Sequence, residues 1–173
     1  QELGDNSGAG RAYWTVGYSF ARQNRSEDSR RATHTALELC QKAGDQYGIG
    51  NAFNVFTFIE ADIAERIKYL QQAKKAFEIA GYVERQGVAL ANLGIAYSEL
   101  GLHQHNHRLQ SEVVEIDRAM GAKLGLAYDL SNLINPELIL GKMDAARMHL
   151  REMETLVPDL GDPQMESNTF SNR

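Results

Sequence analysis

The feature that most constrains this sequence is that it repeats itself at a spacing of about forty residues. At that offset residues 4–10 align with residues 44–50, and residues 36–39 align with residues 76–79. A glycine followed by an apolar and a small residue returns at Gly87 and again at Gly125. A unit of this length cannot bury an apolar face alone, so we expect several copies to stack on one another.

Apolar residues within the copies follow helical spacing. Leu90, Leu93 and Tyr97 recur at i, i+3 and i+7, and Gly94 leaves room on that face for a second helix. No segment alternates with period two, so we predict an all-α fold. The predicted helices are residues 7–22, 26–43, 48–61, 63–81, 84–100, 103–120, 124–140 and 143–156. Glycines at four helix ends are predicted C-terminal caps: Gly44, Gly101, Gly121 and Gly141.

Four units can be counted from starts near Gly10, Gly50, Gly87 and Ala127. We number the places of each unit from its starting residue, which is place 1. Large apolar residues fill places 4 and 7 of every unit: Tyr13 and Val16, Phe53 and Phe56, Leu90 and Leu93, Leu130 and Leu133. Place 8 is Gly17 and Gly94 in the first and third units, and the fourth unit has Ala146 at place 20 and Pro158 at place 32.

This pattern resembles the tetratricopeptide repeat, in the longer-period form of large bacterial signalling regulators and the kinesin light chain. The resemblance implies a right-handed α-solenoid of about four antiparallel helix pairs. The repeat domain then covers residues 1–160, with units at about 10–43, 50–83, 87–121 and 127–160. Residues 161–173 are a polar tail or a truncated next repeat. Tyr69 and Asn106 depart from the family, which has Ala at place 20.

Composition narrows the class of partner. The chain carries 23 acidic against 18 basic residues, which argues against a nucleic-acid surface. The single cysteine, Cys40, cannot form an internal disulfide, so we expect a reducing, cytoplasmic compartment. No run approaches the roughly eighteen apolar residues of a membrane span. Residues 2–5 resemble the end of a preceding helix, so we expect a fragment of a longer bacterial signalling or regulatory protein.

Candidate chemical sites are weak. His103 and His107 lie at i and i+4 near Glu99 and are either an incomplete metal site or solvated or packing residues. The glycine-rich joints lack the strand and lysine of a phosphate-binding loop, so those glycines are interpreted as structural. Cys40 has no adjacent base to activate it. We therefore predict no catalysis, no cofactor and no metal in this chain.

A binding groove is the stronger prediction, because the first helices of stacked pairs line one surface. The places of these helices that face the groove are 2, 5, 6, 9, 12 and 13 of each unit. They hold aromatic anchors, amides and charged residues: Arg11, Trp14, Tyr18, Arg22, Asn51, Asn54, Phe58, Asn92, Glu99, Tyr128, Asn132 and Asn135. The same places also hold Asp62, Ala91, Ile95 and Ser131. Resemblance to the kinesin light chain implies that Asn92 and Asn132 contact a peptide backbone. The alternative is that the aromatic residues and these asparagines make internal contacts.

Pro136 interrupts a predicted first helix, either as a tolerated kink or by freeing the Asn132 carbonyl for a ligand. Together these features predict a non-catalytic protein–protein interaction module that binds a peptide or protein segment in its groove. Two alternatives stay open. The chain could be the regulatory repeat region of a multidomain enzyme such as a nucleotide cyclase, with the active site outside these residues, or it could be a structural spacer or a self-association module. A homodimer through exposed repeat ends is a further prediction.

Overall fold

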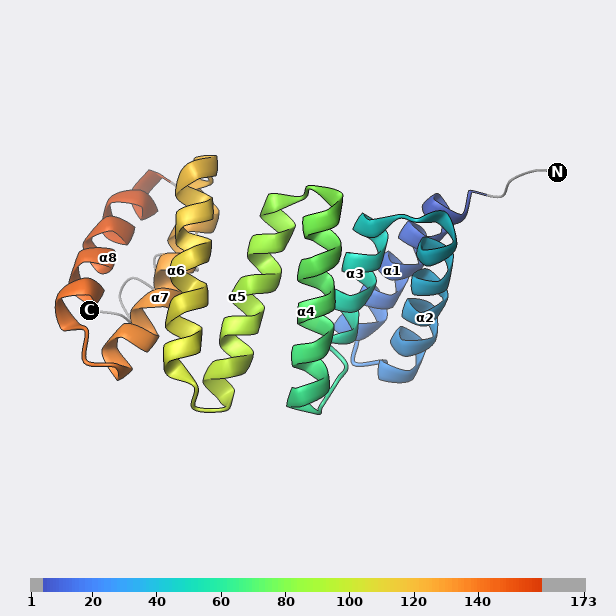
Figure 1. The fold of residues 1–173 in the computed structure, drawn as a ribbon, viewed down its shortest axis with the longest axis horizontal. Coiled ribbons are helices and arrows are strands. Elements are labelled where there is room, and N and C mark those ends of the chain that lie inside the picture. Colours follow the sequence, from blue (N-terminus) through green and yellow to red (C-terminus); the bar gives the residue numbers. More distant parts are fainter. Residues whose placement is uncertain (1–4, 160–173) are drawn as a thin grey trace. The chain divides into compact units, whose positions relative to one another are not determined.

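The computed structural model describes residues 5–159. This part of the chain forms eight α-helices, a short 3-10 turn and no strand, which confirms the all-α prediction (Figure 1). The elements are α1 (Asn6–Arg22), α2 (Ser26–Ala43), α3 (Gln46–Phe56), α4 (Ile63–Ala80), α5 (Val83–Glu99), α6 (His103–Met120), α7 (Lys123–Ile139), α8 (Met143–Leu156) and η1 (Val157–Asp159). None of the helices in residues 5–159 is both long and apolar enough to cross a membrane.

The structure corrects the extent of α3, which was predicted over residues 48–61. The helix begins earlier because the Asp45 side chain caps it, accepting from the Gly48 N–H at 3.0 Å. It ends at Phe56, where the N–H groups of Phe58 and Ile59 turn back to carbonyls three residues earlier. Asp62 then caps α4 through the N–H groups of Ala64 and Glu65, so residues 57–62 form the connection.

Glycines in the left-handed conformation end five of the helices. The four predicted caps all have positive φ, and Gly81, predicted as the last residue of its helix, is a fifth cap with φ 74°. Only glycine adopts this conformation without a Cβ clash, so the joints between helices are fixed by sequence.

The chain divides into two compact units between Ala89 and Leu90, inside α5. In the first unit, α1 packs on α2 and α3, and α3 packs on α2 and α4. Phe56, Leu70 and Phe77 are the largest side chains buried there. Exclusion of such side chains from water is the main force holding these helices together.

In the second unit, α7 packs on both α6 and α8. Its core is a cluster from all three helices that includes Val114, Leu130, Leu133 and Met153. Pro136 is buried in α7, and the helix continues past it to Ile139, so the fold tolerates the missing N–H.

Candidate functional site

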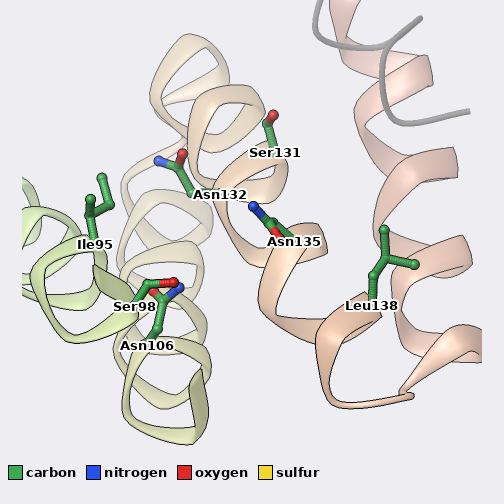
Figure 2. A pocket seen from close by; sticks show the side chains of 7 residues that line it. All are labelled: Ile95, Ser98, Asn106, Ser131, Asn132, Asn135 and Leu138. Carbon is green, nitrogen blue, oxygen red and sulfur yellow. The ribbon is translucent and has the colours of Figure 1, made fainter. Parts of the chain in front are cut away.

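A pocket of about 420 Å³ lies in the second unit, among the side chains of three helices. Ile95 and Ser98 come from α5 and Asn106 from α6. The remaining lining residues come from α7: Ser131, Asn132, Asn135 and Leu138 (Figure 2). The structure thus brings together two predicted site residues, Asn132 and Asn135, with five others.

None of the seven lining side chains carries an ionisable group. Five of them are amides or hydroxyls, which can both donate and accept hydrogen bonds, and two are aliphatic. Burying an ion here would leave it without a counter-ion on the pocket wall, which is costly. The lining therefore suits an uncharged polar group with some apolar surface.

The polar side chains on the pocket wall differ in their hydrogen-bond partners. The Asn132 Nδ2 atom lies 3.4 Å from Asp129 Oδ1, one turn earlier in α7, and can donate to it. The Ser98 hydroxyl lies 3.3 Å from His103 Nδ1. Asn106 is 5 % exposed, and its Oδ1 atom has no hydrogen-bond partner within residues 5–159. Beside it, Gln110 Nε2 donates to the Ala91 carbonyl at 3.0 Å.

Several predicted groove residues of the first unit make internal contacts instead. Arg11 forms a bidentate ion pair with Asp45 and lies over the Tyr47 ring. This guanidinium is the main cause that lowers the pKa of Asp45 to about 2. Tyr18 and Phe58 meet edge to face, with ring centroids 5.4 Å apart. For these residues, internal contact is an observed role, and contact with a partner stays a prediction.

Asn51 does not lie on an exposed groove surface, so that prediction was wrong. Its side chain is 2 % exposed, and its Nδ2 atom donates to the Tyr47 carbonyl at 2.8 Å within α3. The physical reason is that α3 packs against three other helices, α1, α2 and α4, so little of its surface remains exposed.

The other predicted residues remain on or near the surface. Arg22, Glu99 and Asn135 are exposed, whereas Trp14, Asn54, Asn92 and Tyr128 are half-buried. Tyr128 packs on the core of the second unit, and Asn92 is not among the residues that line the pocket. Their role in binding a partner stays a prediction.

His107 belongs to a separate cluster where α6, α7 and α8 meet. Glu137 is 1 % exposed, and its carboxylate lies 3.0 Å from His149 Nδ1 and 3.6 Å from His107 Nε2. Lys142 Nζ lies 3.2 Å from His107 Nε2. The pKa of His107 is lowered, mainly by burial and secondly by the positive charge of Lys142. No group of three residues suited to a metal ion is found in residues 5–159, and His103 lies beside Ser98.

No family model and no curated protein matches this sequence. Solved structures do match: aspartyl phosphate phosphatase F from Bacillus subtilis aligns over 96 % of this chain, with TM-score 0.87 and 14 % identity. The apo form of RapI aligns over 97 %, with TM-score 0.86 and 13 % identity. A signal-transduction ATPase with a tetratricopeptide repeat sensor, from Pyrococcus horikoshii, aligns over 90 %, with TM-score 0.76 and 16 % identity.

This chain has a tetratricopeptide-repeat-like fold. The predicted fold class, an all-α repeat of antiparallel helix pairs, is confirmed. The chain spans 45 % of the phosphatase, 48 % of RapI and 25 % of the ATPase. At such low identities the likeness concerns the fold alone, so the function must come from the residues of the pocket.

Sequence reasoning missed Ser98, Asn106 and Leu138 as pocket residues. One signal pointed to Asn106: it fills place 20, where the tetratricopeptide repeat has a small residue, and it faces Gly94 of the same helix pair. A methyl group on Gly94 would lie 2.8 Å from Asn106 Oδ1. The glycine therefore makes the space that the larger amide fills.

Proposed function

We propose that this chain is a non-catalytic protein-interaction module that binds a peptide or protein segment at the pocket formed by α5, α6 and α7. The observation that carries the proposal is the pocket wall, which combines three amides and two hydroxyls with Ile95 and Leu138. A peptide offers the same combination, since its backbone has alternating donors and acceptors and its side chains supply apolar surface.

The properties of the partner follow from the same wall. With no cationic side chain among the lining residues, the pocket has no means of neutralising the phosphates of a nucleic acid. A cytoplasmic location fits Cys40, a buried free thiol whose pKa is raised by burial to about 11. The proposal assigns neither a cofactor nor a catalytic step to these residues.

A second proposal is that the chain is the regulatory part of a longer protein. The Pyrococcus protein is described as an ATPase with a tetratricopeptide repeat sensor, and this chain matches a quarter of its length. Peptide binding at the pocket would then be the sensing step, and any enzymatic activity would belong to other domains.

The test is selection of a random peptide library displayed on phage, followed by affinity measurement with purified peptides. We expect selected peptides to bind the Asn132→Ala/Asn135→Ala variant about tenfold or more weakly, since two amide hydrogen bonds are lost. Gln86→Ala is the matched control, because Gln86 is a half-buried amide of α5 outside the pocket lining and outside the predicted groove. Peptides that bind all three folded proteins equally would contradict the proposed site.

A further inference from the structure

We propose that this pocket selects an uncharged carboxamide side chain, glutamine or asparagine, in the bound segment, and that Asn106 is the selecting residue. The inference rests on the proposed function, since it names the chemical group that the pocket receives. Five observations carry it: the unpartnered oxygen of Asn106, the residues at its place in other helix pairs, the orientation of two amides, the uncharged wall, and the depth of Asn106.

Asn106 is a buried amide whose hydrogen-bonding capacity is not fully used inside the structure. It lines the pocket and is 5 % exposed, yet its Oδ1 atom has no hydrogen-bond partner among residues 5 to 159. A buried polar group without a partner costs stability, so native proteins rarely keep one without a reason. Because this Oδ1 atom is closed off from solvent, a ligand in the pocket can bond only to the Nδ2 group of Asn106, and that bond would offset part of the cost.

Other helix pairs show that the polar side chain is not needed for packing. Ser29 fills the same place in the first pair, and its hydroxyl donates to the Gly17 carbonyl at 2.8 Å. Ala146 fills it in the α7–α8 pair and is buried without any polar atom. Tyr69 fills it in the second pair, where its ring stacks on Phe56. Of the four residues at this place, Asn106 is the one with a buried polar side-chain atom that has no hydrogen-bond partner within residues 5–159.

The orientations of two amides define the complementary group. Asn106 Oδ1 is shut off from solvent beside Gly94, which leaves the Nδ2 group of Asn106 as the donor toward the pocket. Asn132 Nδ2 is directed to Asp129, which leaves Asn132 Oδ1 as an acceptor. A ligand group must accept from Asn106 and donate to Asn132, and a carboxamide does both.

The wall also discriminates against charged relatives of that group. A glutamate or lysine side chain would meet no ionisable residue among the seven that line the pocket. Asp129 is not among the lining residues, and it interacts with Asn132 and Asp117. Ile95 and Leu138 offer apolar contact for the methylene stem of the ligand side chain.

A side chain rather than a bare backbone reaches Asn106. This residue lies on α6, the second helix of its pair, and is almost fully buried, whereas exposed Asn135 lies on α7, a first helix. A peptide backbone that contacts Asn135 would need a side chain to extend inward to Asn106. The depth of Asn106 therefore distinguishes side-chain selection from backbone recognition.

The experiment is a proton–nitrogen NMR titration with four capped residues as probes: the N-acetyl, N-methylamide derivatives of glutamine, glutamate, methionine and alanine. All four share the backbone amides, and methionine matches glutamine in length without the amide. We expect the glutamine probe to bind at least about fivefold more tightly than the others and to shift the signals of Ser98, Asn106 and Asn132.

Asn106→Ala should abolish the glutamine preference, and Gln86→Ala, a change outside the pocket lining, should keep it. The last helix pair already has a buried alanine, Ala146, at the equivalent place, so the fold accepts alanine there. Asn106→Leu is a second variant, which removes the amide but fills its volume. Equal binding of the glutamine and methionine probes would overturn the inference, as would a glutamine preference that persists in folded Asn106→Ala or Asn106→Leu.

The outcome is separable from that of the proposed function. If displayed peptides depend on Asn132 and Asn135 while the probes show no glutamine preference, the pocket recognises a backbone, and only the carboxamide inference fails. If the glutamine probe binds through Asn106 while no displayed peptide depends on the pocket, the inference stands, and the peptide-binding function fails.

Discussion

Asp117 and Asp129 bring two carboxyl groups together between α6 and α7. Burial first, and then repulsion by and hydrogen bonding with the Asp117 carboxyl, raise the pKa of Asp129 from 3.8 to about 7. Near neutral pH the pair therefore exchanges a proton, one turn away from Asn132 on the pocket wall. Between about pH 4 and pH 7, Asp129 keeps its proton in the folded chain, whereas an aspartate in the unfolded chain has lost it.

Asp129→Asn should stabilise the protein at pH 8 by about 2 to 4 kcal/mol, because it removes the cost of ionising a buried carboxyl. The wild type loses stability as pH rises from about 4 to 7 and carries the full cost above 7, so the gain of the variant should vanish near pH 4. Denaturant unfolding at pH 4, 6 and 8 measures this difference. Asp144→Asn is the control, since that side chain is fully exposed.

A gain for Asp129→Asn that is the same at pH 4 and pH 8 would contradict the explanation based on ionisation. It would show instead that the amide improves packing or hydrogen bonding with Asp117. Equal stability of the wild type and the variant at pH 8 would show that Asp129 ionises without a cost.

At the scale of helices, the approach of α3 to α4 depends on Gly50. A methyl group on this glycine would lie 2.7 to 2.9 Å from three atoms of the Phe77 ring, and Phe77 is itself buried. Real Cβ atoms do not approach an aromatic ring this closely, so one of the two helices would have to shift.

Gly50→Ala should therefore destabilise the protein by about 1 to 3 kcal/mol, as overpacking of a core does. An ordinary helical glycine gives the opposite sign, since alanine there gains about 0.5 to 1 kcal/mol. The measurement is the denaturant midpoint of Gly50→Ala in two backgrounds, the wild type and Phe77→Leu. The cost should shrink beside the smaller leucine, and an unchanged or increased midpoint in the wild type would contradict the packing argument.

The helices were predictable because their signals are local. Apolar spacing and glycine caps placed α2, α6 and α8 at their observed bounds. The end of α3 was not predictable in this way, because Phe58 and Ile59 continue an apolar run that the backbone leaves at Phe56. Short apolar runs do not record where a helix stops when no glycine or proline marks the end.

The pocket was only half predictable, for a tertiary reason. Asn132 and Asn135 follow from helical spacing along α7, since their outward direction is a property of one helix. Asn106 lines the pocket because Gly94 on another helix makes room for it, and Asn51 is buried in a helix that packs on α1, α2 and α4. Neither packing relation is visible in the spacing of a single segment.

At the scale of the whole molecule, α1 exposes apolar side chains that the helix beginning the third repeat unit buries. Tyr13 and Val16 are 45 % and 43 % exposed, whereas Leu90 and Leu93 at the same places of the third repeat unit are buried. Repeat proteins bury such positions against neighbouring units. The homodimer through exposed repeat ends stays a prediction, and this face of α1 is the surface that it would use.

The division into two compact units predicts that damage to one core stays local. Phe77→Ala empties a site in the first unit and should cost about 3 to 5 kcal/mol, and Leu130→Ala does the same in the second at about 2 to 5 kcal/mol. Since repeat folds gain stability from neighbouring contacts, each change should mainly lower the protection of amides in its own unit. Hydrogen exchange read by mass spectrometry should show α3 and α4 losing protection in Phe77→Ala, and α7 and α8 losing it in Leu130→Ala. The two variants serve as controls for each other, and a uniform loss of protection from α1 to α8 in both would mean that the chain unfolds as one cooperative body.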